Sequence, residues 1–162
     1  MIAEAVHAGI QAGLAQAAHA PKDAYKAAER RLYALPVLER KAACDKERLA
    51  EIRAQGAAAR SRSLVRFQRG GYRLSPEDMH EAVMRDMEAS IAADEHEIGE
   101  VRRALGEIAG DPYYLAVEGR YLLSMDDEAI AALVPCDPVT VWRNRRRLVQ
   151  TVAVLLYGAA AL

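Results

Sequence analysis

Apolar residues recur every three or four positions over most of this chain, the spacing that places them on one face of an α-helix. The first stripe ends before Pro21, which predicts a helical arm over residues 1–21. Because polar positions are sparse on its other face, we expect this arm to be frayed or to depend on a partner. The stripe consists of Ile2, Val6, Ile10 and Leu14.

A second helical pattern begins at Lys22 and continues to Ile52. Pro36 interrupts it, and proline removes a backbone donor and crowds the preceding turn. The sequence therefore predicts a helix that stops or kinks at Pro36 and then resumes. The apolar positions before and after the proline are Tyr25, Leu32, Leu35, Leu38, Ala42 and Leu49.

The longest stripe follows Ser75 and Pro76, a pair typical of helix starts because serine can cap the first amides and proline suits the first turn. The spacing predicts one helix over 76–109, and a rise of about 1.5 Å per residue makes it about 50 Å long. Gly110 and Pro112 end it. Its apolar positions are Met79, Val83, Met87, Ile91, Ile98, Val101, Leu105 and Ile108.

A stripe of this length needs a partner. The run at 37–54, folding back along the chain, predicts an antiparallel, coiled-coil-like helical hairpin within residues 22–110. Because the 76–109 stripe is longer than this partner, we expect part of it to be left for a second copy of the chain. The region 22–110 is therefore expected to form a homo-oligomer.

Between the two arms of this hairpin the helical period is lost, and residues 53–74 carry six arginines and no acidic residue. Residues 75–110, in contrast, carry ten acidic and three basic residues. The formal net charge of −1 conceals this polarity, and binding to polyanions depends on local patches. We expect the basic loop to contact DNA phosphates, and the alternative is a solvated surface. The residues expected to contact the phosphates are Arg62, Arg66 and Arg69.

From residue 111 to residue 162 the pattern predicts three shorter helices. The first runs through Tyr114, Val117 and Tyr121. Ser124 is expected to cap the second, DDEAIAAL, and Asp137 is expected to cap the third, which Pro138 opens. The last two helices are joined by about four residues, which is helix-turn-helix spacing.

In such a motif the second helix enters the major groove of double-stranded DNA, where arginine can bind guanine and asparagine adenine. Ile130, Ala131, Val134, Cys136 and Val141 are expected to face the core. Trp142 either covers this core or contacts the groove, and the alternative for the whole region is a three-helix core with a solvated arginine face. The residues expected to bind DNA are Thr140, Trp142, Arg143, Asn144, Arg146 and Arg147.

The block EAIAALVPCDPVTVWRNRRRLV resembles the promoter-reading C-terminal domain of sigma factors, whose pattern is IA-x-x-L-x-x-S-x-x-T-V-x-R. Pro135 replaces the usual glycine of the turn, and Asp137 replaces the usual serine cap. The proline puts the turn geometry in question because it holds φ near about −65°. The direct matches are Ile130, Ala131, Thr140 and Val141.

The block YKAAERRLYALPVLERKAACDKERLAEI resembles the N-terminal motif of phage ArpU/RinA-type late transcription regulators, Y-K-x-x-E-x-x-L-Y-x-Y-P. Leu35 stands where that motif has an aromatic residue. The two blocks together cover most of residues 22–157 in the family's order. The resemblance implies a DNA-binding activator of phage or prophage late genes in the host bacterial cytoplasm, with host RNA polymerase as a further partner. The matching residues are Tyr25, Lys26, Glu29, Leu32, Tyr33 and Pro36.

Composition supports an all-α class, because 10 glycines, 6 prolines, one Trp and one Phe are too few for a sandwich or barrel. Cys44 and Cys136 lie far apart and are expected to be reduced thiols. The four histidines show no metal spacing, and Gly70-Gly71 lacks the residues of a phosphate loop. We therefore expect no catalysis, no cofactor and no metal.

Two other functions fit this organisation. One is a small terminase-like DNA-recognition subunit, although such subunits usually place the DNA domain first. The other is an adaptor whose acidic helix contacts RNA polymerase without touching DNA. No membrane association is expected, because the N-terminus lacks the basic start of a secretory signal and the apolar tail after Gln150 is shorter than the about 20 residues of a membrane span.

Overall fold

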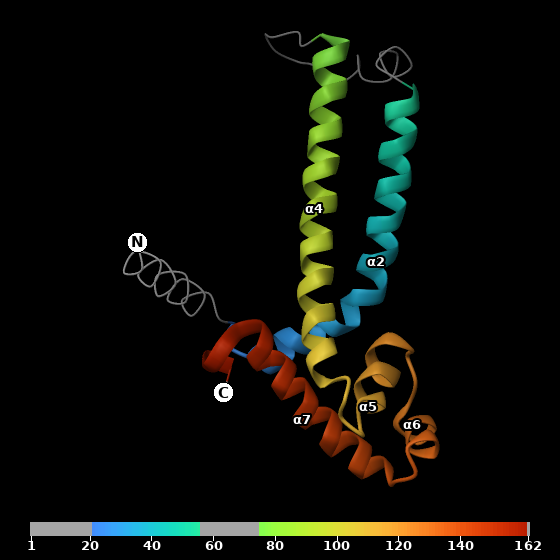
Figure 1. Cartoon of the computed structure of the whole chain (residues 1–162), viewed down its shortest axis with the longest axis vertical. Helices are drawn as coiled ribbons and strands as arrows, with labels where there is room; N and C mark the ends of the chain where they lie inside the picture. The colour runs from blue at the N-terminus through green and yellow to red at the C-terminus, as the bar shows by residue number, and fades with distance from the viewer. Residues whose placement is uncertain (1–20, 56–74, 162) are drawn as a thin grey trace. The chain divides into compact units, whose positions relative to one another are not determined.

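The computed structural model describes residues 21–55 and 75–161, and in these ranges every regular element is helical (Figure 1). The all-α class is therefore confirmed for the described residues. The predicted N-terminal arm and the segment 56–74 lie outside them. The elements are α2 (Ala24–Gln55), α4 (Pro76–Ile108), α5 (Leu115–Val117), the π-helical η2 (Glu118–Leu122), α6 (Asp127–Leu133), α7 (Pro138–Tyr157) and the 3₁₀ turn η3 (Gly158–Ala161).

The described residues pack into two compact units, the hairpin unit and the C-terminal unit. Of the described residues, the hairpin unit contains 37–55 and 75–98, and the C-terminal unit contains 21–36 and 99–161. The boundaries of these units differ from those of the segments 22–110 and 111–162 that the sequence suggested. The difference arises because α2 and α4 each contribute one part to each unit.

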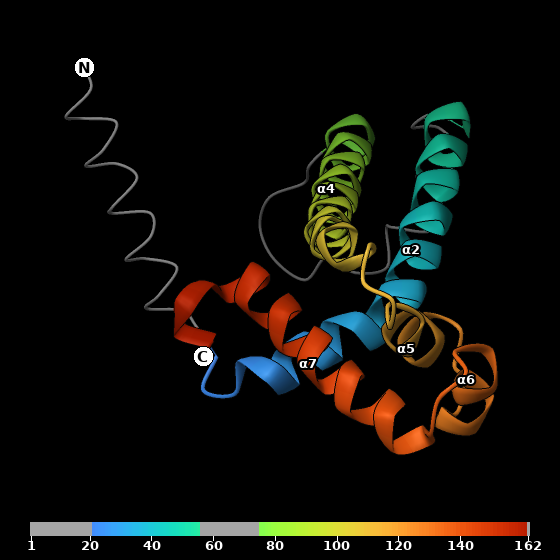
Figure 2. The same cartoon turned by 60° about the horizontal axis from the view of Figure 1, so that its bottom comes forward.

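In the hairpin unit, α2 from residue 37 and α4 up to residue 98 lie side by side and antiparallel (Figures 1 and 2). Ion pairs join the two helices between Lys46 and Glu95, at 2.5 Å, and between Lys41 and Asp94. The predicted hairpin is therefore confirmed. Exposed ion pairs contribute about 0–1 kcal/mol each, so burial supplies most of the stability. The buried apolar residues are Ala42, Leu49, Ile52 and Ile91.

The basic loop begins later than predicted. Arg53 lies in the last turn of α2, and its guanidinium is 2.6 Å from the Glu88 carboxylate of α4. Its neighbour Ile52 is buried against the hairpin. These tertiary contacts extend the helix to Gln55, which corrects the predicted boundary at residue 53.

Local sequence signals account for most of the helix ends. The Ser75 hydroxyl accepts a hydrogen bond from the Asp78 amide at 3.1 Å, and the Asp78 carboxylate accepts one from the Ser75 amide at 3.2 Å. This reciprocal cap confirms the predicted start of α4. Pro36, in contrast, does not stop α2, because buried Leu32 and Leu35 stabilise the turn that contains it.

The core of the C-terminal unit includes a cluster between α6 and α7. Ala116, Ile130, Ala131 and Val141 are buried there, and Cys136 packs against them. Four of the five predicted core residues thus belong to this cluster, and the fifth, Val134, is half-buried. The early turns of α2 and the last turns of α4 add Leu32, Leu35, Val101, Ala104, Leu105 and Ile108 to the buried residues of the unit.

Two predictions for the chain between α5 and α6 are wrong. Ser124 does not cap α6, because it adopts φ 55° in the connection that follows η2. Asp126 caps the helix instead, since its carboxylate accepts a hydrogen bond from the Ala129 amide at 2.8 Å. The predicted first helix is also not one regular α-helix, because it widens into the π-helical turn η2 after Val117.

The widened turn brings Gly119 against the core. A Cβ at this position would lie 2.9 Å from Ile130 Cγ1 and 3.1 Å from its Cδ1. Ile130 is fully buried and has no room to withdraw. Only a residue without a side chain fits this approach of η2 to α6.

We expect the substitution Gly119→Ala to lower the free energy of unfolding by about 1–3 kcal/mol, because it overpacks the cluster around Ile130. Gly106→Ala is the matched control, since nothing lies within 4 Å of a Cβ added there on α4. It should raise stability by about 0.4–1 kcal/mol through the unfolded state. Urea denaturation followed by circular dichroism measures both. Equal effects of the two substitutions would contradict the close approach.

Candidate nucleic-acid interface

Helix α7 begins where the sequence placed it. Pro138 occupies the first helical position, and the amides of Thr140 and Val141 donate to the Asp137 carbonyl at 2.8 and 3.1 Å. The predicted cap by the Asp137 side chain is wrong, because that side chain makes no capping hydrogen bond and only the Asp137 carbonyl serves the first turn. Residues 134–137 form the whole connection from α6, which confirms the predicted four-residue length.

One face of α7 is buried and the opposite face is exposed. Val141, Arg145, Leu148 and Val149 face the core. Because residues three and four apart share a helix face, the exposed positions form one stripe, the outer stripe. It consists of Val139, Trp142, Arg143 and Arg146; Arg147 is exposed as well and is paired with Asp111.

The outer stripe begins with apolar side chains. Val139 is 58% exposed and Trp142 is 47% exposed, so Trp142 is not a closed lid over the core. The Arg146 guanidinium carbon lies 5.7 Å from the centroid of the indole ring, at cation–π distance. Beside them is a shallow hollow of about 260 Å³, lined by Asp127, Glu128, Pro138, Val139 and Trp142.

Two predicted DNA contacts are engaged within the chain. The Asn144 amide donates to the Thr140 carbonyl at 3.0 Å, and its oxygen accepts from Arg147 at 3.3 and 3.4 Å. Arg147 also donates to the Asp111 carboxylate at 2.8 Å. Thr140 is half-buried. Asn144 and Arg147 therefore hold α7 to the start of the C-terminal segment.

Asp111 is a structural anion in this arrangement. Burial opposes its charge, but hydrogen bonds from the Tyr113 amide and from Arg147 outweigh that effect and hold the pKa of Asp111 below its usual value. Asp111 therefore carries its charge at neutral pH and accepts both bonds.

Arg145 was not singled out by the sequence, although it is the most buried charged residue of the described chain, at 9% exposure. Its guanidinium binds both carboxylate oxygens of Asp127 on α6, one of them at 3.1 Å. The hydrogen bond from Arg145 lowers the pKa of Asp127. The helical period could have identified it, because Arg145 lies four residues after Val141 and four before Val149.

The early turns of α2 are joined to η2 through a polar cluster. The Tyr121 hydroxyl donates to the Glu29 carboxylate at 2.7 Å, and its ring meets Tyr33 edge-on with centroids 4.7 Å apart. Arg120 donates to the Tyr33 hydroxyl at 3.1 Å. Burial, with the bond to Glu29, raises the pKa of Tyr121 far above its usual value. Glu29 and Tyr33, which carried the resemblance at the N-terminus, thus position the C-terminal helices.

Arg62, Arg66 and Arg69 lie outside the described residues. Within the described ranges, no group of three or more His, Cys, Asp or Glu side chains could hold a metal ion, and Cys44 and Cys136 are free thiols. None of the described helices combines the length and the apolar character needed to cross a membrane.

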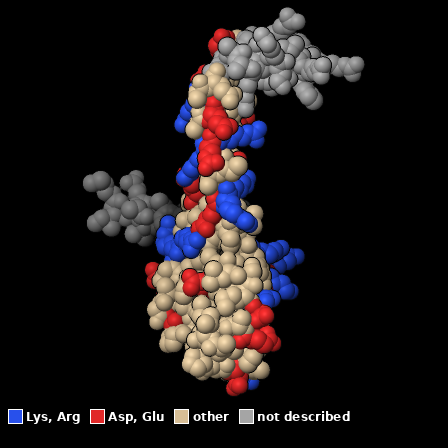
Figure 3. All heavy atoms as spheres, turned by 90° about the vertical axis from the view of Figure 1, so that its right-hand side faces the viewer, with Lys and Arg blue, Asp and Glu red and all other residues tan. Residues whose placement is uncertain are grey.

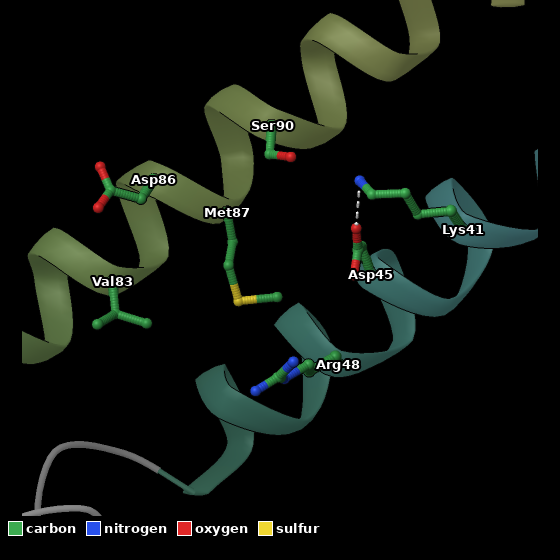
Figure 4. A pocket seen from close by; sticks show the side chains of 7 residues that line it. All are labelled: Lys41, Asp45, Arg48, Val83, Asp86, Met87 and Ser90. Carbon is green, nitrogen blue, oxygen red and sulfur yellow. Dashed lines mark hydrogen bonds and ion pairs between the residues drawn. The ribbon is translucent and has the colours of Figure 1, made fainter. Parts of the chain in front are cut away.

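A second hollow, of about 370 Å³, lies between α2 and α4 in the hairpin unit. Val83 and Met87 extend toward α2, whereas Asp86 points away from it (Figure 4). Lys41 and Asp45 form an ion pair at 2.9 Å along its edge. On the face shown in Figure 3, basic and acidic side chains alternate along this hairpin rather than forming a patch of one sign. The remaining lining residues are Arg48 and Ser90.

Comparison of the chain with protein-family models, with curated proteins and with solved structures gives no match.

Proposed function

We propose that this protein is a sequence-specific DNA-binding transcriptional regulator of phage or prophage late genes, with α6 and α7 as its helix-turn-helix motif. The outer stripe of α7 is the observation that carries this proposal. It presents Trp142, Arg143 and Arg146 on one face, directly after a four-residue connection from α6. A recognition helix docks in the major groove through such a face.

The local charges support the same role. Arg143 and Arg146 are exposed, whereas the neighbouring carboxylate of Asp127 is paired with Arg145. The start of α7 also carries the partial positive charge of a helix N-terminus. These charges favour a polyanion over Arg143 and Arg146.

The resemblance to late transcription regulators supports the biological part of the proposal. By this resemblance, the protein is proposed to act in the host bacterial cytoplasm as an activator that cooperates with RNA polymerase. The first motif block contacts η2, which precedes the second block in the C-terminal unit, through Glu29 and Tyr121 and through Tyr33 and Arg120.

Fluorescence anisotropy with labelled random-sequence duplexes tests DNA binding, and selection from the same library gives the preferred site. We expect binding at about 50 mM salt that weakens linearly with the logarithm of salt concentration, with a slope of about −0.9 per phosphate contact. The selected site should be bound more tightly than the random pool. Absence of binding to every duplex at low salt would overturn the proposal and favour the protein adaptor.

We further propose that Arg62, Arg66 and Arg69 contact phosphates. Replacing all three with alanine should weaken binding to all duplexes similarly and reduce the salt slope by about 0.9 for each phosphate-binding arginine removed. The control replaces Arg85 and Arg103, two exposed arginines of α4 that pair with Glu81 and Glu100 on the same helix. An unchanged salt slope in the triple variant would indicate that these arginines face solvent or bind a protein partner and do not contact DNA.

The proposed assembly is a dimer formed through the hairpin unit. The last turns of the α4 stripe are covered by the chain itself, since Val101 and Leu105 are buried. Its first half instead keeps four half-buried apolar side chains, of which Val83 and Met87 line the hollow of Figure 4. These residues are Met79, Val83, Met84 and Met87.

Sedimentation equilibrium should therefore show a dimer, and Met87→Glu should shift it toward monomer because it places a charge on the apolar surface. Ala92→Glu, at an exposed position of the same helix, is the control. A wild-type protein that stays monomeric at every concentration would contradict the dimer.

A further inference from the structure

We propose that Val139 and Trp142 form an apolar reading surface for the C5-methyl groups of thymine in the major groove. This inference rests on the proposed DNA-binding function and specifies the chemistry that α7 recognises. Among the four bases, only thymine presents a methyl group in the major groove, and apolar side chains recognise it by contact.

The position of the two side chains supports this role. They lie three residues apart in the first two turns of α7, where a docked recognition helix reaches base edges. Both side chains are about half exposed, Val139 at 58% and Trp142 at 47%. This exposure is unusual, because large apolar side chains are usually buried and Trp142 is the only tryptophan of the chain. The hollow beside them is open enough to receive an atom group from outside.

The charge at the rim of the hollow selects an uncharged occupant. The exposed carboxylate of Glu128 lines it together with that of Asp127, whose charge is paired with Arg145. The Glu128 carboxylate repels a phosphate oxygen, whereas a methyl group on a base edge carries no charge. Arg143 and Arg146 follow on the outer stripe and supply the attraction for the DNA as a whole.

The hydrogen bonds of Asn144 disfavour the alternative that this side chain recognises adenine. Its amide and its oxygen are both used within α7, by Thr140 and Arg147. Adenine readout by this side chain would compete with the two bonds that its oxygen already accepts from Arg147. The outer stripe therefore combines a methyl reader with Arg143, whose guanidinium suits guanine. The preferred site is expected to place thymine beside guanine.

Four alternating synthetic duplexes of equal length test the inference, by competition for a labelled random duplex at one salt concentration. They are poly(dA-dT), poly(dA-dU), poly(dG-dC) and poly(dG-dC) with 5-methylcytosine. Uracil differs from thymine only by the missing methyl group, and 5-methylcytosine places a methyl at the same ring position. We expect poly(dA-dT) to bind several-fold more tightly than poly(dA-dU), at about fourfold per buried methyl group, and methylation of cytosine to strengthen binding.

Trp142→Ala and Val139→Ser should each reduce the preference for methylated duplexes while retaining helical circular dichroism. Leu133→Ser is the matched control, because Leu133 is an exposed apolar residue of α6, at 61%, that does not line the hollow. It should keep the full preference.

Equal binding of poly(dA-dT) and poly(dA-dU) by the wild-type protein would overturn the methyl-reading role and leave DNA binding intact. A preference that survives both Trp142→Ala and Val139→Ser would also overturn it. Absence of binding to all four duplexes and to the labelled random duplex would overturn the proposed function itself and assign the apolar surface to a protein partner.

Discussion

Replacing Asp127 with asparagine is expected to lower the free energy of unfolding by about 3 kcal/mol, because it leaves the Arg145 guanidinium buried without its counter-ion. This is the lower end of the range for breaking a buried ion pair, about 3–5 kcal/mol. The lower end applies because the Asp127 side chain is 25% exposed, whereas that of Arg145 is 11% exposed. The pair joins α6 to α7, so its loss also loosens the position of the outer stripe.

The pH dependence of this effect has a definite sign. The hydrogen bond from Arg145 holds the pKa of Asp127 below its unfolded value, which is about 3.9 for aspartate. The stabilisation is therefore complete above the unfolded pKa and is lost as the pH falls through the lower folded pKa. The stability difference between wild type and Asp127→Asn should be constant near neutral pH and shrink below about pH 4.

Urea denaturation of both proteins over this pH range measures the difference. Glu81→Gln is the control, because Glu81 pairs with Arg85 on the surface of one helix and should contribute less than about 1 kcal/mol. The double variant Asp127→Leu with Arg145→Met should recover most of the loss, since it removes both charges. A loss in Asp127→Asn no larger than in Glu81→Gln would contradict the structural role of the pair.

The second large effect concerns DNA recognition. Arg143→Ala should lower affinity for the selected site by about 1–3 kcal/mol, or 5- to 150-fold, and relax the base preference at one position. Binding to a scrambled duplex should change little, because a base contact contributes only where its base is present. Arg146→Ala should lower binding to both duplexes together, since Arg146 lies a turn further along α7 and is expected to meet phosphates.

Measuring both variants on selected and scrambled duplexes at one salt concentration separates the two roles. Arg103→Ala, on the exposed surface of α4, provides the baseline. Arg147→Ala is less informative, because it also removes the bond to Asp111. If neither Arg143→Ala nor Arg146→Ala discriminates between the duplexes, α7 is not the reading helix.

The sequence alone predicted the helical class and most helix ends, because these depend on interactions between residues close along the chain. Ser75 and Asp78 cap α4 within one turn, and Pro138 begins α7 without needing a backbone donor. The helical period also identified the buried side of the α6–α7 pair, including Ile130 and Val141. The predicted cap at Ser124 failed because two polar residues stood near one helix start, and the path of the chain through η2 selected Asp126.

Only the tertiary structure decided which charged side chains are buried and which turns pack against the core. The run Arg143–Arg147 contains four arginines that look alike in the sequence, yet Arg145 is buried against Asp127 while Arg143, Arg146 and Arg147 remain exposed. The widening at η2 depends on the approach of Gly119 to Ile130, eleven residues later in the chain. Contacts of Glu29 with Tyr121 likewise join parts of the chain that are 92 residues apart. Burial and pairing of this kind depend on how elements pack against each other, and local patterns do not carry that information.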